Sequence, residues 1–162
     1  MATYSDLRLD HRLFMQGYPF SKYRISGIKP ALLSKPLKQS RLAIVTTAGL
    51  HTDNQVAFNQ KDKSGDCSFR EIAADVEVQS LVESHKSSAF DHSGIEKDRN
   101  LAFPVDRLRE FKTQGIIGEI NHRHFSFMGS IINPQKLIEE TAPAVASALT
   151  SDRVEAVILT PV

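Results

Sequence analysis

The chain has 162 residues, of which 41% are hydrophobic and 24% charged, and its formal net charge is +1. That length suits one domain with a sizeable core. The small net charge argues against nucleic acid as a partner, because binding phosphates requires a basic excess, and no apolar run approaches the roughly 18 residues that span a membrane. Cys67 is the one cysteine, so no internal disulfide or CxxC pair can form in these residues, and no signal-peptide pattern opens the chain. We therefore expect a cytoplasmic protein.

Residues 1–40 differ in character from the rest of the chain. They are rich in aromatic residues and contain three prolines, but they show little sustained periodicity. This composition predicts an N-terminal arm that lies on a partner or on its own domain, followed by a single domain over residues 41–162.

Three segments of the second part have the character of strands. Residues 42–47 form a short β-branched apolar run that ends at Ala48-Gly49, which is typical of a buried parallel strand. After a polar loop over residues 51–66, the alternation of residues 76–82 favours a strand. Residues 154–159 are again apolar and predict a third strand.

Two segments have the character of helices, and a third segment is a possible short helix with a capping residue before it. Residues 104–114 begin with a proline in the first turn and end before Gly115. A second helix opens at Asn133-Pro134, and its apolar face recurs every fourth residue at Leu137, Thr141, Val145 and Leu149. Asp66 could cap a short helix running through residues 70–72. Strands alternating with helices predict an α/β fold with an open, mostly parallel sheet and flanking helices.

Five of the six histidines lie in three polar clusters, at residues 46–53, 84–92 and 121–126. The first two clusters each follow a predicted strand. If these strands end at the same edge of the sheet, both clusters converge on one crevice. Several imidazoles there could hold a metal, move protons or bind an anion.

Each cluster also has a plain structural interpretation. Residues 46–49 are equally a strand end with a glycine turn, and His51 is equally a solvated loop residue. Asp91-His92 commonly fixes a loop through local hydrogen bonds. His122-Arg123-His124 fits an exposed strand as well as a binding site.

Five motifs in series nevertheless form a pattern. They are Thr46-Thr47-Ala48-Gly49-Leu50-His51, Gly65-Asp66 with Ser68-Phe69-Arg70, Phe90-Asp91-His92, Phe103-Pro104-Val105-Asp106-Arg107-Leu108, and His124-Phe125-Ser126-Phe127-Met128-Gly129. In this order, over residues 40–162, they resemble the selenoprotein B family of the glycine, sarcosine, betaine and D-proline reductases. The short length is closest to the D-proline reductase type.

The resemblance implies an oxidoreductase subunit that reductively cleaves a carbon–nitrogen bond of a small amino acid or betaine, with a disulfide as the acceptor product. It further implies other reductase subunits and a thiol electron donor as partners, and neither nucleic acid nor membrane. In such proteins the strand matching residues 154–159 leads to selenocysteine or cysteine. A selenolate or thiolate there is stabilised by the following helix N-terminus and acts as the nucleophile.

No redox residue follows that strand here, because the sequence stops at Thr160-Pro161-Val162. We expect the C-terminal part of the domain to be missing and the truncated chain to be inactive. The favoured explanation is a UGA codon at position 163, read as stop in place of selenocysteine; the alternative is a true fragment or a degenerate member. No cofactor is expected within the chain itself, and selenocysteine or cysteine is expected just beyond Val162.

The residue roles that the resemblance implies are hypotheses. We expect His51 and His92 to transfer protons or bind the substrate carboxylate, with Asp91 orienting His92. The groups expected to bind substrate are Thr46, Thr47, Gly49, Arg123 and His124. No metal is expected.

Two other classes of protein remain open. One is a metal-binding, hydrolase-like domain that uses His51, His85, His92 and His124. The other is a non-catalytic assembly subunit whose N-terminal arm docks on a partner. Metal analysis and co-purification, respectively, distinguish them from the reductase.

Overall fold

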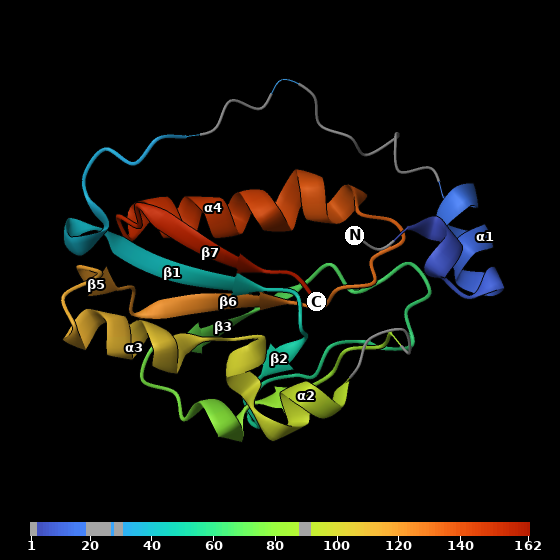
Figure 1. Ribbon diagram of the computed structural model, residues 1–162, viewed down its shortest axis with the longest axis horizontal. Coiled ribbons are helices and arrows are strands. Elements are labelled where there is room, and N and C mark those ends of the chain that lie inside the picture. Colours follow the sequence, from blue (N-terminus) through green and yellow to red (C-terminus); the bar gives the residue numbers. More distant parts are fainter. Residues whose placement is uncertain (1–2, 19–26, 28–30, 88–91) are drawn as a thin grey trace. The chain divides into compact units, whose positions relative to one another are not determined.

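The computed structural model of the chain describes residues 3–18, 27, 31–87 and 92–162 (Figure 1). The chain divides into two compact units, Met1–Leu32 and Leu33–Val162. The first contains a short 3₁₀ helix, η1 (Tyr4–Asp6), and helix α1 (Leu9–Gly17). Asp91, predicted as a catalytic residue, lies outside the described residues.

The second unit is built on a five-stranded sheet whose central strand is β1. Strand β1 pairs in parallel with β5, β6 and β7, whereas β3 runs antiparallel to β6. The strands are β1 (Arg41–Thr46), β3 (Phe69–Ala73), β5 (Glu119–Ile120), β6 (Arg123–Phe127) and β7 (Ala156–Thr160). A separate antiparallel pair is formed by β2 (Leu50–His51) and β4 (Val82–Glu83). The mixed, mostly parallel sheet confirms the predicted α/β class.

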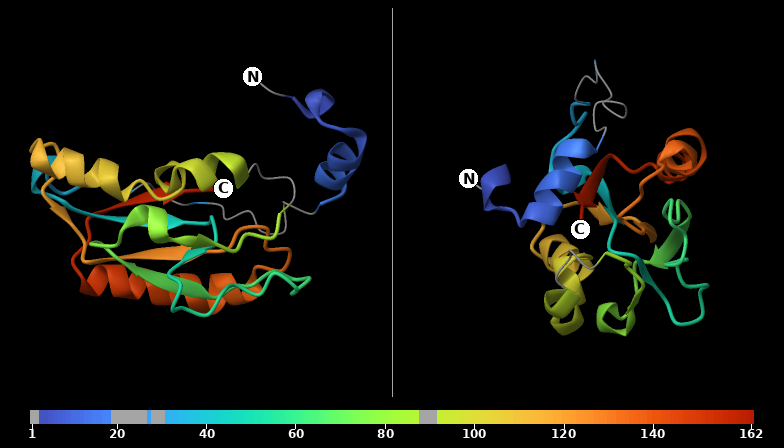
Figure 2. Two further views of the ribbon diagram at one scale, coloured as in Figure 1. Left: turned by 90° about the horizontal axis from the view of Figure 1, so that it is seen from below. Right: turned by 90° about the vertical axis from the view of Figure 1, so that its right-hand side faces the viewer.

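Helices cover both faces of this sheet (Figure 2). One face packs under α4 (Ala142–Ser151), which continues from a π-helical turn at Leu137–Thr141. The other lies against α3 (Val105–Thr113) and α2 (His92–Lys97). Alternate residues of β1 serve the two cores: Leu42 and Ile44 pack on the α3 side, and Ala43 packs on the α4 side.

Most of the predicted elements are confirmed. The strand at residues 42–47 is β1, and the run at residues 154–159 is β7. The helix predicted at residues 104–114 is α3, with Pro104 as its N-cap. Val145 and Leu149 are the buried residues of the second helix, as its four-residue spacing indicated.

Two predictions about residues 66–82 are wrong. Residues 76–82 contain a 3₁₀ turn (Val78–Ser80), capped by the Glu77 side chain, and only the last of them enters strand β4. Residues 70–72 belong to strand β3 and not to a helix, because the segment extends along β6 and pairs with it at five positions. Asp66 therefore caps no helix; its carboxylate accepts hydrogen bonds from the Ser68 backbone N–H and hydroxyl.

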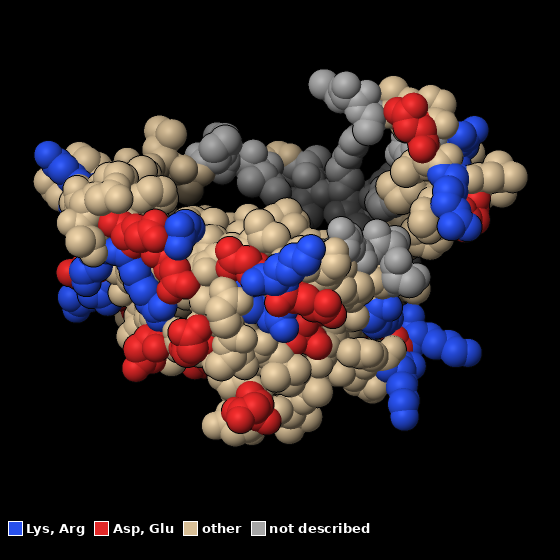
Figure 3. Space-filling view, turned by 60° about the horizontal axis from the view of Figure 1, so that its bottom comes forward, with Lys and Arg blue, Asp and Glu red and all other residues tan. Residues whose placement is uncertain are grey.

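Charges of both signs are interspersed on the face of the second unit that carries α2 and α3 (Figure 3). None of the described helices is long and apolar enough to cross a lipid bilayer.

Candidate active site at the carboxyl edge of the sheet

The parallel strands β1, β6 and β7 end side by side. Thr46, at the end of β1, is in register with Ser126 of β6 and Thr160 of β7. Residues just beyond these strand ends are also hydrogen-bonded to one another. The Thr47 carbonyl oxygen accepts from the Gly129 backbone N–H at 2.7 Å. Thr47 Oγ1 accepts from the Val162 N–H at 2.9 Å. Three loops thus start at one edge, where open α/β sheets bind their ligands.

The segment Glu83-Ser84-His85 runs against this edge. The Ser84 backbone N–H donates to the Gly49 carbonyl oxygen at 2.9 Å. Gly49 has a φ of +67°, and a Cβ atom there would lie 3.1 Å from both the His85 nitrogen and the Ser84 carbonyl carbon. Glycine at position 49 therefore lets the two backbones approach; a direct role in binding substrate is not needed to explain it.

His51 and Ser84 join the first two histidine clusters, but the antiparallel pairing of β2 with β4 brings them together, and not the predicted second parallel strand. The His51 imidazole is buried, with Nδ1 2.8 Å from the Thr52 carbonyl oxygen and Nε2 2.8 Å from Ser84 Oγ. Because a carbonyl oxygen only accepts, Nδ1 carries the proton and Nε2 accepts from the serine hydroxyl.

His92 has hydrogen-bond acceptors at both of its ring nitrogens. Its Nδ1 lies 2.8 and 3.0 Å from the two carboxylate oxygens of Glu83, and its Nε2 lies 3.0 Å from the Ser87 carbonyl oxygen. The hydrogen bond to Glu83, supported by that to Ser87, raises the pKa of His92 above its usual value. The Glu83 carboxylate therefore orients the His92 ring in the described part of the chain.

His85 occupies the space next to the end of β7. Its ring is buried, and its Nε2 lies 2.7 Å from the position that a Cβ atom on Gly129 would take. The Val162 carbonyl oxygen is 3.1 Å from that same position. Burial lowers the pKa of His85, an effect that Glu83 partly opposes. The rings of His85 and His92 are 6.3 Å apart, centre to centre.

The site therefore contains two neighbouring imidazoles whose pKa values are shifted in opposite directions. The surroundings favour the protonated form of His92 and the neutral form of His85. Such divergence separates a proton donor from a neutral hydrogen-bonding group within one site. Proton transfer and anion binding are the chemistry that this arrangement supports.

Arg123 and His124 lie elsewhere. Arg123 begins β6, at the opposite edge of the sheet, where its Nε and Nη2 bind the two carboxylate oxygens of Asp152 at 2.7 and 3.0 Å. It also contacts Glu71 at 3.2 Å. These contacts raise the pKa of Arg123 and lower that of Asp152 to about 2. The structure does not bring Arg123 to the other predicted site residues.

His124 is fully buried inside the sheet. Its Nδ1 accepts a hydrogen bond from the Ile44 backbone N–H at 3.1 Å, and its ring meets that of Phe103 edge-on at 5.5 Å. Burial lowers the pKa of His124 to about 4, so it is neutral near pH 7. This environment describes a core histidine.

The two threonines that were predicted to bind substrate contact the backbone of the C-terminal strand. Thr46 Oγ1 lies 3.3 Å from the Thr160 carbonyl oxygen and accepts from the Ala48 N–H at 3.2 Å. Thr47 Oγ1 holds residue 162 through the Val162 N–H. Both hydroxyls thus position the chain at the end of β7.

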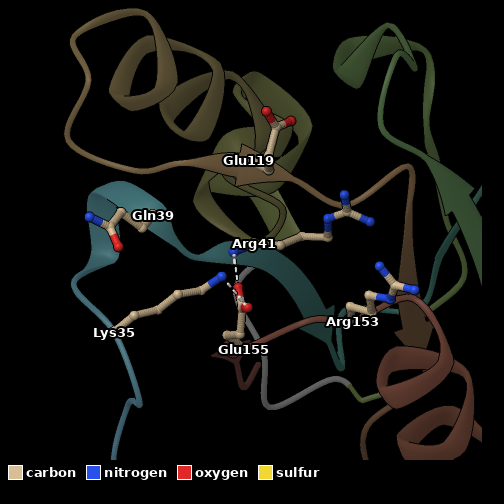
Figure 4. A pocket seen from close by; sticks show the side chains of 6 residues that line it. All are labelled: Lys35, Gln39, Arg41, Glu119, Arg153 and Glu155. Carbon is tan, nitrogen blue, oxygen red and sulfur yellow. Dashed lines mark hydrogen bonds and ion pairs between the residues drawn. The ribbon is translucent and has the colours of Figure 1, made fainter.

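A hollow at the opposite edge does not have the features of an active site (Figure 4). It is lined by Lys35, Gln39, Arg41, Glu119, Arg153 and Glu155. The Glu155 carboxylate is already bound by Lys35 Nζ and by the Arg41 backbone N–H, each at 2.5 Å. The hollow lies at the amino ends of β1, β5 and β7, whereas ligands bind at the carboxyl ends of parallel strands.

No group of three or more His, Cys, Asp or Glu side chains within the described ranges is placed to hold a metal ion. The histidines named for that alternative are also occupied in other ways, since His124 lies in the core and His51 is bonded at both ring nitrogens.

Two residues of this site were missed in the sequence. Glu83 directly precedes the Ser84–His92 cluster, but a lone carboxylate at the end of an ambiguous segment carries no spacing signal. Gly129 closes the last of the five motifs, yet its steric role depends on residues 47, 85 and 162, which the sequence does not show to be neighbours. His85 was considered only as a metal ligand.

These features describe an α/β protein in which two histidines, His85 and His92, lie close together at the carboxyl edge of the sheet. The model of the glycine/sarcosine/betaine reductase selenoprotein B family matches residues 7–162. The chain belongs to this family.

Its relatives include subunits of two kinds of reductase. The D-proline reductase subunit gamma of Acetoanaerobium sticklandii is 36% identical over 128 residues, which cover 79% of this chain and 51% of that protein. The glycine reductase complex component B subunit gamma of Peptoclostridium acidaminophilum is 26% identical over 149 residues, covering 88% of this chain and 32% of that protein. The chain thus spans about half the length of the first relative and about a third of the second. No solved structure matches the chain.

Proposed function

We propose that the chain is part of a reductase subunit that cleaves a carbon–nitrogen bond of a small amino acid or betaine, with a selenolate or thiolate just beyond Val162 as nucleophile. The observation that carries this proposal is the position of the end of β7. Thr47 Oγ1 accepts a hydrogen bond from the Val162 N–H at the edge of the sheet where the rings of His85 and His92 lie close together. Family membership supplies the type of reaction.

The reaction divides into three steps that balance. The selenolate or thiolate attacks the carbon next to nitrogen, forming a bond from carbon to selenium or sulfur while the carbon–nitrogen bond breaks and the amine leaves with a proton. A neighbouring thiolate then attacks the selenium or sulfur, so that the bond to carbon breaks and the carbon takes a proton. The product on the enzyme is a selenenyl sulfide or a disulfide. An external dithiol supplies the two electrons that reduce that selenenyl sulfide or disulfide, and the dithiol itself becomes a disulfide.

His92 is the proposed proton donor to the departing amine. Its protonated form is stabilised by Glu83 and by the Ser87 carbonyl oxygen, so a proton is available near neutral pH. His51, fixed by Ser84, is proposed to contact the substrate carboxylate or to assist the proton transfer.

The proposed partners are inferred from the relatives. One is a subunit of D-proline reductase and another belongs to a glycine reductase complex, so other reductase subunits and a thiol electron donor are expected. The greater identity to the D-proline reductase subunit favours D-proline as the first substrate to assay, ahead of glycine and betaine. A thiol donor is kept reduced in the cytoplasm, where we propose that the protein works.

The nucleotide sequence after codon 162, combined with the intact mass of the native protein, tests the nucleophile. A UGA or cysteine codon followed by further coding sequence, and a mass well above 18.0 kDa, supports the proposal. An ordinary stop codon with a mass of 18.0 kDa contradicts it and favours an assembly subunit.

Activity is tested on the complete protein with its co-purifying subunits. We expect amine release or ring opening that depends on dithiothreitol, and no activity from residues 1–162 alone. Activity that instead requires added zinc and no thiol would favour the metal-dependent class.

A further inference from the structure

The atoms around Gly129 define a point at the end of β7. The position of a Cβ atom on Gly129 is surrounded by His85 Nε2 at 2.7 Å, the Val162 carbonyl oxygen at 3.1 Å and the Thr47 carbonyl oxygen at 3.2 Å. We propose that His85 Nε2–H donates a hydrogen bond to the selenolate or thiolate that follows β7, and that Gly129 leaves room for the His85 ring. This inference rests on the proposed function and assigns to His85 a role distinct from those proposed for His51 and His92.

The protonation of the His85 ring supports this role. Its Nδ1 lies 3.2 Å from the Ser87 backbone N–H and accepts a hydrogen bond from it. In the neutral ring the proton is therefore on Nε2, the atom that faces the end of β7. Burial favours this neutral form. A neutral N–H donor stabilises the anionic form of its partner and so lowers the pKa of a thiol or selenol.

The hydrogen bonds of the other two imidazoles fix their orientation in the site. His51 donates from Nδ1 to the Thr52 carbonyl oxygen and accepts at Nε2 from Ser84. His92 donates to Glu83 and to the Ser87 carbonyl oxygen. His85 is placed near the end of β7, because its Nε2 and the Val162 carbonyl oxygen lie 2.7 and 3.1 Å from the same point, the Cβ position on Gly129.

The backbone of His85 is fixed, which makes the donor preorganised. The His85 N–H donates to Glu83 Oε1 at 2.9 Å, and the preceding residue is bound to Gly49. Residue 162 is fixed in turn by Thr47 Oγ1. The residue after Val162 therefore starts from a constrained position next to a constrained donor, and little order has to be gained when the hydrogen bond forms.

The test is the pH dependence of alkylation by iodoacetamide in the complete protein, reduced beforehand, with the alkylated residue mapped by mass spectrometry. The rate depends on the anionic fraction of the nucleophile and so reports its pKa. In His85→Asn the amide oxygen can replace Nδ1, but nothing replaces Nε2. We expect the midpoint of alkylation to rise by about one pH unit, which is about a tenfold lower rate below the midpoint.

Two further variants keep the test decisive if His85→Asn folds poorly. The longer His85→Gln places an N–H near the position of Nε2, so it should recover part of the wild-type rate. Gly129→Ala should displace the ring and shift the midpoint upward, as His85→Asn does. The matched controls are His122→Gln, an exposed imidazole, and Gly94→Ala, whose Cβ would meet only a Leu101 methyl group at 3.2 Å; neither should shift the midpoint.

The outcomes separate the two proposals. A cysteine or selenocysteine beyond Val162 that is alkylated with the same midpoint in wild type, His85→Asn and Gly129→Ala overturns the role of His85 and leaves the reductase proposal in place. If no residue beyond Val162 is alkylated, the nucleophile is absent and both proposals fail.

Discussion

The two edges of the parallel sheet carry similar residue types and use them differently. At the amino edge, Arg123, Asp152 and Asn121 form a tight network in which the Asp152 carboxylate accepts three hydrogen bonds. At the carboxyl edge, Glu83, Ser84 and His85 each contact a different part of the site. At the first edge, Arg123 binds the Asp152 carboxylate at both oxygens, whereas the second edge holds two neighbouring imidazoles whose pKa values are shifted in opposite directions. Oppositely shifted pKa values therefore distinguish the carboxyl edge as the candidate site, whereas the amino edge is an ion-pair network.

The largest difference between the edges is expected in turnover. In the complete protein, His92→Ala should lower turnover by about 100-fold or more, because the proposed proton donor is lost. The variant also removes a partner of the largely buried Glu83 carboxylate, so turnover is compared per folded protein, with the urea unfolding midpoint measured alongside. Near-normal turnover removes His92 from the mechanism, and His122→Ala is the matched control for loss of an imidazole.

Stability should respond in the opposite way. Arg123→Ala leaves the buried Asp152 carboxylate without its bidentate partner, and we expect a loss of about 3 kcal/mol in the free energy of unfolding by urea. Turnover of the folded protein should be unchanged. The control Arg107→Ala breaks an ion pair with Glu110 that is about half exposed on both sides and should cost less than about 1 kcal/mol. If turnover falls with Arg123→Ala, Arg123 binds substrate, as the sequence predicted.

The buried His124 makes stability depend on pH. Its pKa is about 4 in the folded protein and near 6.5 in the unfolded chain, so the unfolded state binds the proton first as pH falls. Stability should therefore decrease by about 2 kcal/mol between pH 7 and pH 5 from this group. His124→Asn keeps an acceptor for the Ile44 N–H but does not titrate, so the difference between its urea midpoint and that of wild type should shrink as pH falls. A constant difference would contradict the burial of a neutral ring.

The smallest effect is expected at Ser84. Ser84→Ala removes the hydroxyl that donates to His51 Nε2, and both groups are buried, so we expect a loss of about 1 kcal/mol in the free energy of unfolding. Ser80→Ala, at an exposed hydroxyl bonded to the Glu77 carbonyl oxygen, is the control and should have almost no effect. A similar loss from the two variants would mean that the His51–Ser84 hydrogen bond contributes nothing.

The sequence was sufficient for the elements with a strong local pattern. Strand β1 and helix α4 have the spacing of their secondary structure. The contact between His51 and Ser84 comes from the antiparallel pairing of β2 with β4, so the rule that parallel strands end together does not account for it. Strand β3 was missed because its residues alternate weakly and its partner, β6, lies about fifty positions further along the chain. Local patterns cannot show such a long-range pairing.

The site was predicted only in part, because its contacts also join residues that are far apart in the sequence. Arg123 and His124 looked equivalent to the other polar clusters, because sequence does not tell which end of a strand a residue occupies relative to its neighbours in the sheet. The roles of Glu83 and Gly129 depend on contacts between three loops. Only the positions of these loops in the structure distinguish the histidines of the candidate site from a histidine packed in the core, such as His124.

The segment Glu83-Ser84-His85 has a consequence for tolerance to insertions and deletions. Surface loops usually absorb a change in length, but here three consecutive side chains each contact a different part of the site, with Glu83 on His92, Ser84 on His51 and His85 beside Gly129. Adding or removing one residue before Glu83 would transfer each position to its neighbour and disrupt all three contacts at once. Homologous chains that keep this chemistry should therefore vary in length on either side of the segment and not within it.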